Sequence, residues 1–488
     1  MDKNMLYAVA AIVAVVAVVA VAVVLVSGDD DEDIDDSGSG SSNGSGSSGS
    51  TGTSDGDNDT DDETSAIIAL ATTVDDAVLK VYGNIDGDMD IDEDDVAILE
   101  AMISAGASAE DYPFADANQD GCIDDGDVAV LTAVIEGEAT TIWHINYHDT
   151  DEDGVMDEEV VSTAFPITSI ICTGAPSTFL LLFMLGIVDE VKGASYGSSA
   201  DTALFGDTYL NTDLVACLGT NYLTITFEDG QAGSSDVIAT AGVTAVVSDW
   251  SKTHLTNESD FEDAGIDVVR VSAGAIDLEY MRHSALLLGL LFQKMDRAVE
   301  YVELTEEIYG YVESTVEGAD TPAIIASSMT GYISSSSSDY TRLAEMAGAV
   351  YALDDGVDFS GTTVIKIADH PEVYGYDIDY IVHVRTALSY GLDEDTVAGY
   401  WETYTAAFED WQYAETGQVM VSGTVPVAVR LAYVAYAIHP DLIDLDRVNG
   451  YHQALVDAFY NGLEFDVSSM YFVVTADIAA GFGASSGQ

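Results

Sequence analysis

The chain has 488 residues, of which 87 are Asp or Glu and only 13 are Lys or Arg, so its formal net charge is −74. A protein this acidic lacks the basic surface that a nucleic-acid backbone or an anionic lipid surface requires, which excludes both as binding partners. Because 48% of the residues are hydrophobic, folded cores can still form, and the length predicts two to four domains. The acidic surface is typical of an extracellular or salty environment.

The N-terminal segment contains an uninterrupted apolar run over residues 6–26. As a helix rising 1.5 Å per residue, this run spans about 31 Å, the thickness of a bilayer core. Lys3 precedes the run and the next basic residue is Lys80, so the positive-inside rule places the N-terminus in the cytoplasm. We therefore predict that residues 1–28 are a single-pass anchor in the cell membrane, with the bulk of the chain extracellular. A cleaved signal peptide is the alternative, and it also exports the protein.

Residues 29–65 are Asp, Ser, Gly and Thr with almost no apolar side chains. Such a segment cannot bury enough surface to offset the entropy of ordering it. We predict a disordered, acidic tether.

Residues 66–138 contain two copies of one acidic pattern, here called loop one (84–95) and loop two (116–127). Each loop has side-chain oxygen donors at positions 1, 3, 5, 9 and 12, and position 7 can supply its backbone carbonyl as a ligand. An apolar helix start follows each loop. This spacing lets a 12-residue loop wrap one Ca²⁺, whereas a single acidic loop would more simply be a solvated turn. The predicted calcium ligands are Asn84, Asp86, Asp88, Asp90, Asp92 and Asp95 in loop one, and Asp116, Asn118, Asp120, Cys122, Asp124 and Asp127 in loop two.

This duplicated unit resembles a type I dockerin over nearly all of residues 80–137. The resemblance implies a small all-α module, residues 66–138, that folds on calcium and docks a cohesin domain of another protein. Loop one departs from the family pattern, with Met89 in place of the usual glycine at position 6 and Asn84 at position 1.

A third acidic cluster at 149–154 lacks a carboxylate at position 12 and lies between two stretches that alternate like strands. We therefore predict a hairpin turn there rather than a calcium site. His144 and His148 would lie about 13 Å apart on the first strand, too far to share a metal, and we expect both to be solvated.

Residues 139–488 alternate between apolar strands and helices, which predicts an α/β architecture. A long helical pattern at 278–316 follows the first group of strands. The strand candidates are 167–172, 243–247, 268–271, 323–327 and 364–367.

This region resembles substrate-binding proteins of ABC importers for metal chelates, a family that handles ferric siderophores, haem and cobalamin. The segments that carry the resemblance, in order, are IICTGAPS (170–177), LGIVDEVKG (185–193), DAGIDVV (263–269), LLGLL (287–291), AEMAGA (344–349) and GQVMV (417–421). The resemblance implies a two-lobed periplasmic-binding-protein fold: lobe one (139–275), one long linking helix (276–317), lobe two (318–488), and a ligand cleft between the lobes.

The same resemblance implies where a ligand and a permease would bind. Aromatic or hydroxyl groups near the expected cleft are Tyr196, Trp250, Ser251 and His254 in lobe one, and Tyr332 and Tyr340 in lobe two. Core packing or ordinary surface exposure is the alternative for each aromatic. Glu228 and Glu345 stand near the positions where the family places one carboxylate per lobe against arginines of the permease.

Motifs typical of hydrolases, metalloproteases and P-loop enzymes are missing from the sequence, so we expect no enzyme. The leading hypothesis is a membrane-tethered extracellular receptor that captures an iron siderophore, haem or corrinoid for an ABC importer, with calcium as cofactor. The alternative is a cell-surface interaction protein attached through its dockerin-like unit to a cohesin-bearing, polysaccharide-degrading assembly.

Overall fold

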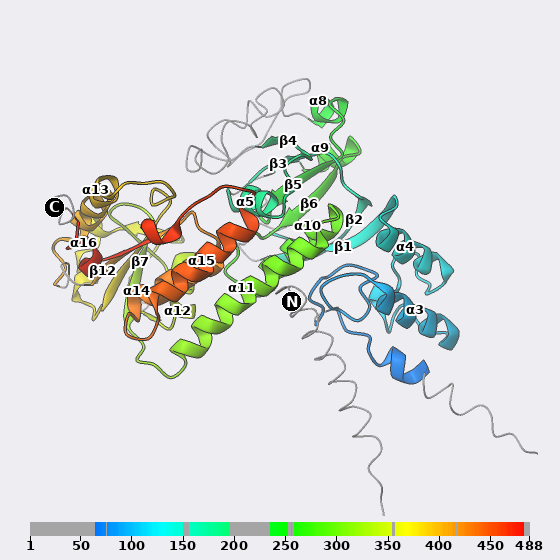
Figure 1. Cartoon of the computed structure of the whole chain (residues 1–488), viewed down its shortest axis with the longest axis horizontal. Helices are drawn as coiled ribbons and strands as arrows, with labels where there is room; N and C mark the ends of the chain where they lie inside the picture. Colours follow the sequence, from blue (N-terminus) through cyan, green and yellow to red (C-terminus); the bar gives the residue numbers. More distant parts are fainter. Residues whose placement is uncertain are drawn as a thin grey trace, which may run out of the picture. The chain divides into compact units, whose positions relative to one another are not determined.

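The computed structural model describes residues 64–74, 76–149, 156–174, 176–194, 235–251, 255, 258–353, 357–412, 414 and 417–482, all of which belong to one compact unit. They form a mixed α/β protein with two separate, mainly parallel sheets, as the sequence predicts (Figure 1). The predicted membrane span at 6–26 and residues 29–63 of the predicted tether lie outside these residues. Within the described ranges, the helices are too short or too polar to cross a bilayer.

In the loop–helix module (66–138), an α-helix starts at position 10 of each acidic loop. Helix α3 (Glu93–Ala105) starts in loop one, the short helix η1 (Pro113–Ala115) precedes loop two, and α4 (Asp125–Glu136) starts in loop two. Asp92 and Asp124 cap the two helices with matching capping boxes, in which the residue at loop position 12 bonds back to the N-cap backbone. The two predicted loop–helix starts are therefore confirmed.

A β-hairpin connects the module to lobe one. Strand β1 (Thr140–His148) pairs with the antiparallel β2 (Asp157–Phe165), which confirms the predicted strands; turn residues 150–155 lie outside the described residues. The expectation of solvated histidines is wrong, because His144 is 0% and His148 6% exposed. The reason is that β1 packs against the module and lobe one together, so most of its residues are buried.

Lobe one contains a four-stranded parallel sheet in the order β4-β3-β5-β6. Its elements are β3 (Ile170–Cys172), α5 (Pro176–Met184), β4 (Val191–Ala194), α8 (Ser235–Thr240), β5 (Ala245–Asp249), α9 (Glu258–Asp263) and β6 (Asp267–Val271). The strands are continuous apolar runs because helices and the hairpin cover both faces of the sheet.

The connection between the lobes differs from the predicted single helix. The 278–316 pattern is broken into α10 (Leu278–Leu291) and α11 (Met295–Val316) at Gln293, whose φ is +55°. Gly289 allows the break, because a Cβ at this position would lie 2.4 Å from the Cβ of Ala298. Helix α10 therefore packs on lobe one, and α11 runs to α14 and α15 of lobe two (Figure 1).

Lobe two contains a five-stranded sheet in the order β13-β12-β11-β7-β9, parallel except for β13 at one edge. Its strands are β7 (Ala323–Ser327), β9 (Val350–Tyr351), β11 (Tyr380–Arg385), β12 (Gln418–Ser422) and β13 (Val473–Thr475). The strand predicted at 364–367 is β10 (Val364–Lys366), which pairs with β8 (Tyr332–Ser334) outside the main sheet. The helices are α12 (Asp339–Met346), α13 (Glu394–Thr405), α14 (Val427–Ile438), α15 (Leu445–Phe459) and α16 (Ala476–Ala479), with short helices η5 (Ile367–Asp369), η6 (Pro371–Gly375), η7 (Ala406–Phe408) and η8 (Val467–Ser469).

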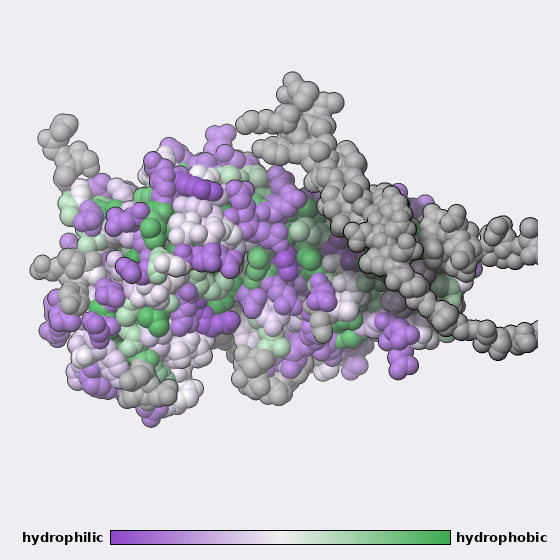
Figure 2. All heavy atoms as spheres, turned by 90° about the horizontal axis from the view of Figure 1, so that it is seen from below, coloured by the Kyte–Doolittle hydropathy of each residue, from purple (hydrophilic) through white to green (hydrophobic). Residues whose placement is uncertain are grey.

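Figure 2 shows one face of the molecule, on which hydrophilic residues are spread over the described surface and hydrophobic residues lie in small groups between them. This distribution agrees with a chain of high negative charge that stays soluble through its surface.

Candidate functional site

Ligands of open α/β sheets bind outside the carboxyl ends of the parallel strands. In this protein these ends form two edges. The carboxyl edge of lobe one consists of the loops after β3, β5 and β6, and that of lobe two of the loops after β7, β11 and β12. Tyr309 on α11 lies between the two edges. Its hydroxyl donates to the carbonyl oxygen of Ile276, which follows β6 of lobe one (2.9 Å), and the positive charge of Arg430 in lobe two acts to lower its pKa.

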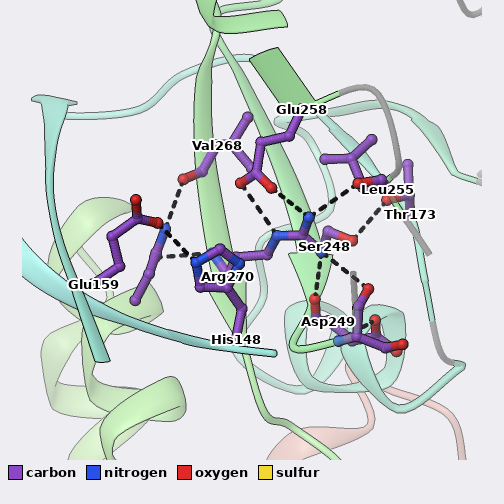
Figure 3. Close-up of polar contacts among 11 residues, drawn as sticks. His148, Glu159, Thr173, Ser248, Asp249, Leu255, Glu258, Val268 and Arg270 are labelled. Carbon is purple, nitrogen blue, oxygen red and sulfur yellow. Dashed lines mark hydrogen bonds and ion pairs between the residues drawn. The ribbon is translucent and has the colours of Figure 1, made fainter. Parts of the chain in front are cut away.

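Arg270 organises the carboxyl edge of lobe one (Figure 3). It is 1% exposed, and its guanidinium donates to the carbonyl oxygens of Asp249 (2.9 Å), Ser251 (3.1 Å) and Leu255 (3.1 Å). Glu258 balances its charge, with Oε2 2.6 Å from Nη2. Because Nε, Nη1 and Nη2 of Arg270 all have partners and Glu258 pairs with its charge, Arg270 fixes the loop after β5 and is not free to bind a ligand.

Two glycine positions hold the neighbouring loops close to this edge. Gly174 has a φ of +96°, and a Cβ there would lie 2.9 Å from the backbone nitrogen of Asp249. A Cβ on Gly274 would lie 2.7 Å from Oγ of Ser177. The loops after β3, β5 and β6 are therefore packed against one another, which only glycine permits at these two points.

Two of the lobe-one residues predicted to bind a ligand lie at this edge. Trp250 and Ser251 follow β5 directly, and both are partly exposed. The Trp250 carbonyl accepts a hydrogen bond from the Asp149 backbone nitrogen (3.0 Å), which joins the loop to the end of β1. Tyr196, His254 and Glu228 lie outside the described residues, so their predicted roles remain predictions.

The carboxyl edge of lobe two contains a buried arginine that sequence reasoning missed. Arg385 ends β11 and is 3% exposed. Its guanidinium donates to the carbonyl and hydroxyl oxygens of Ser327 and to Nδ1 of His383 (3.2 Å). Among the described residues no carboxylate forms an ion pair with it, and its buried Nε has no hydrogen-bond partner. Burial lowers the pKa of Arg385 to about 10, so it remains charged at neutral pH.

A second arginine lies close to the first. Arg430, on α14, donates through Nη2 to the carbonyl oxygens of Gly423 (2.7 Å) and Val425 (3.0 Å), and its buried Nε also has no hydrogen-bond partner in the part of the chain that the structure describes. Burial lowers its pKa as well. Tyr340, a predicted ligand residue, influences the pKa of both arginines and therefore lies near them at this edge. In the described part of lobe two, Arg430 likewise forms no ion pair with a carboxylate.

The other two predicted residues of lobe two, Tyr332 and Glu345, lie on β8 and α12. Tyr332 begins β8 in the small two-stranded sheet, opposite Lys366. Glu345 is exposed on α12, as a contact with another protein requires. A signal for Arg385 was present in the sequence, namely a basic residue that ends a buried strand in a chain with only 13 basic residues.

Two hollows lie away from these edges. One of about 470 Å³ is at the amino ends of the lobe-two strands, the opposite end of β11 from Arg385, and is lined by Asp320, Thr321, Pro322, Asp379, Tyr380, Gly417, Ile438 and His439. The other, of about 580 Å³, lies where loop one and the end of α4 face the α10–α11 junction.

The two acidic loops are folded alike around their own carboxylates. Asp95 accepts hydrogen bonds from the backbone nitrogens of Ile85 (2.6 Å) and Asp92 (3.0 Å), and Asp127 accepts in the same way from Asn118 (3.0 Å) and Asp124 (2.9 Å). Burial, together with neighbouring carboxylates, raises the pKa of Asp90 to about 6 and of Asp95 to about 7. Closely spaced carboxylate oxygens of this kind suit a hard divalent cation such as Ca²⁺. In the described residues, however, no three or more His, Cys, Asp or Glu side chains converge as a metal centre, so calcium binding remains a prediction.

Comparison with known proteins finds similarity at the level of structure. No family model and no curated protein matches the sequence. The chain is similar to a TroA-like periplasmic binding protein, FepB, from Veillonella parvula (16% identity, 65% of this chain and 97% of that one, TM-score 0.47). It is also similar to a periplasmic haem-binding protein from Pseudomonas aeruginosa (12%, 57% and 94%, 0.38) and to a protein of an Fe³⁺-hydroxamate transport system from Saccharomonospora viridis (19%, 57% and 95%, 0.37). These neighbours are solute-binding proteins, and similarity at this level assigns no function to this chain.

Proposed function

We propose that this protein is a cell-surface receptor that binds an anionic metal chelate, such as a ferric siderophore or haem, and passes it to an ABC importer. The observation that carries the proposal is Arg385, a buried guanidinium without a carboxylate partner among the described residues. Leaving a buried charge uncompensated is unfavourable by several kcal/mol, in the general case. In a chain with 87 acidic residues, an arginine kept apart from all described carboxylates is best explained by an anion supplied from outside.

The surroundings of the arginines suit a planar or chelated ligand. The ring of Tyr404 lies 4.6 Å from the Arg385 guanidinium carbon, and Tyr340 lies near both arginines. Trp250 stands at the corresponding edge of lobe one. Aromatic faces bind the organic part of a chelate, and the two guanidiniums bind its carboxylate or phenolate oxygens.

The two-lobed topology supports capture between the lobes. Each lobe has its own mainly parallel sheet, and α11 connects α10 on lobe one with α14 and α15 on lobe two. A single connecting helix permits only a small change in the angle between the lobes, which suits a receptor that captures its ligand with little closure. Glu345 on α12 would meet a basic patch of the permease, and residues 6–26 would hold the receptor at the cell surface.

Calcium would bind in loops one and two through the carboxylate, amide and carbonyl oxygens predicted from their spacing. The ion would neutralise the carboxylates of Asp90 and Asp95, whose pKa is raised by burial and, to a lesser extent, by neighbouring carboxylates. The cohesin partner stays a prediction from the sequence.

The test is calorimetric titration of the full chain in detergent with a ferric tricatecholate, haem and cobalamin. We expect micromolar or tighter binding of an anionic chelate and weaker binding of cobalamin, which offers the arginines no strong negative charge. No binding of either anionic chelate at micromolar concentration would contradict the proposal.

A further inference from the structure

One short segment belongs to both the loop–helix module and the receptor hairpin. Val81 forms an antiparallel bridge with His144 of β1. On either side of it, the Tyr82 nitrogen donates to the Trp143 carbonyl (2.9 Å) and the Ile145 nitrogen to the Lys80 carbonyl (3.0 Å). Residues 80–82 therefore act as a third strand beside β1 and β2.

Loop one is bonded to the same segment. The Leu79 nitrogen donates to the carbonyl of Asp88 (3.2 Å), and the Asn84 nitrogen donates to the carbonyl of Val81 (3.1 Å). The Asn84 side chain, at loop position 1, donates from Nδ2 to the carbonyls of Leu79 (2.8 Å) and Asp88 (3.0 Å). The conformation of loop one therefore sets the conformation of residues 79–82.

Lys80 fixes this segment to lobe one. Its side chain is 4% exposed, and Nζ lies 3.0 Å from Oε1 of both Glu158 on β2 and Glu279 on α10. Its backbone nitrogen donates to Nδ1 of His283 (3.1 Å), whose Nε2 in turn donates to the Ile145 carbonyl (2.8 Å). Burial lowers the pKa of His283 to about 4, so the ring is neutral and both of its nitrogens are engaged.

The hairpin carries the connection on to the carboxyl edge of lobe one. Asn146 on β1 donates from Nδ2 to the Val268 carbonyl (3.1 Å) and accepts from the backbone nitrogen of Arg270 (3.0 Å). Arg270 then holds the loop after β5 (Figure 3). Asp149 at the end of β1 donates from its backbone nitrogen to the Trp250 carbonyl (3.0 Å) in that loop.

We propose that the loop–helix module is a calcium-dependent brace for lobe one: calcium in loop one orders residues 79–82 and, through β1 and Arg270, the loop that carries Trp250. This inference rests on the calcium binding proposed above, but not on the chelate. It also means that the module is built into the receptor, in contrast to a domain that swings freely on a tether.

The test is hydrogen exchange of the full chain, followed by mass spectrometry, with saturating calcium and with a calcium chelator. We expect calcium to slow exchange by about tenfold, corresponding to about 1.4 kcal/mol, in β1 and in residues 249–251 as well as in loop one. Lys80→Met should keep calcium binding and the protection of loop one but lose the protection of residues 249–251. Lys192→Met, at an exposed lysine that donates to the carbonyl of Asp189, is the matched control and should behave as wild type.

Protection confined to residues 72–137 in the wild-type chain would overturn the brace, whatever the variants do. Unchanged protection of residues 249–251 in Lys80→Met would overturn the route through Lys80. Calorimetry of calcium binding separates the two claims: binding without protection of lobe one contradicts the brace alone, whereas no binding contradicts calcium in the loops and the brace with it.

Discussion

The guanidinium carbon of Arg385 lies 4.6 Å from the ring centroid of Tyr404, in a site where no described carboxylate balances its charge. Arg270 in lobe one is equally buried but pairs with Glu258 and donates to three carbonyls. Under the proposed function, this contrast separates a structural cation, Arg270, from one that binds an anion, Arg385.

Removing the unpaired charge should not weaken the fold. Because burial without a counter-ion opposes the charged form of Arg385, Arg385→Met should leave the free energy of unfolding unchanged or raise it by about 1 kcal/mol. Denaturant unfolding of the ligand-free protein measures this. A loss of more than about 2 kcal/mol would show that Arg385 is structural.

Arg270→Met should have the opposite effect. It leaves the Glu258 carboxylate and three carbonyls without their donor, at a cost of about 3–5 kcal/mol. Limited proteolysis should then cut near residues 249–258, and Arg282→Met, at a more exposed ion pair with Glu306, serves as the control. Equal stability of the two variants would contradict this assignment.

The buried histidines predict a particular pH dependence. Burial lowers the pKa of His452, which bonds to the hydroxyls of Tyr390 (2.6 Å) and Tyr433 (3.0 Å), to about 3. Between pH 6.5 and 3 the unfolded chain binds a proton at this residue that the folded chain does not, so its contribution to stability falls as the pH falls. His452→Gln should therefore lose less stability than wild type between pH 7 and pH 5, by about 2 kcal/mol. Parallel curves of unfolding midpoint against pH would show that the histidine is not held neutral.

Glu345 provides a separation of binding from transport. Its side chain is exposed on α12. Under the proposed function, Glu345→Lys should leave chelate affinity unchanged but reduce uptake in cells at least tenfold, because it would place a positive charge against the basic patch proposed on the permease. Glu303→Lys, an exposed position on α11, is the control. Unchanged uptake would exclude Glu345 from the permease contact.

Local patterns predicted much of the fold and less of the site. The strand at 323–327 is β7 residue for residue, and the starts of α3 and α4 follow from the acidic caps at Asp92 and Asp124. The break at Gln293 was missed because apolar spacing continues through it, while the close approach of Gly289 to Ala298 is a tertiary contact.

The difference in charge pairing between Arg385 and Arg270 was also missed, because it too depends on tertiary contacts. Whether Arg385 has a counter-ion depends on which carboxylates the fold brings near it, and sequence spacing carries no such information. Likewise, we predicted a solvated His144 because alternation shows only on which face of a strand a residue lies. It does not show that other parts of the chain cover that face, and His144 is in fact fully buried. Tyr340 was found only through the resemblance of its surroundings to a known family.

The most direct measurement of the central claim is the affinity of Arg385→Met for a ferric tricatecholate, compared with wild type and with Arg342→Met, an exposed arginine 51% accessible on α12. The account predicts that Arg385→Met binds at least tenfold more weakly, a loss of about 1.4 kcal/mol, while Arg342→Met binds as wild type does. Equal affinity of Arg385→Met and wild type, with both proteins folded, would contradict the role of the buried arginine as the anion-binding group.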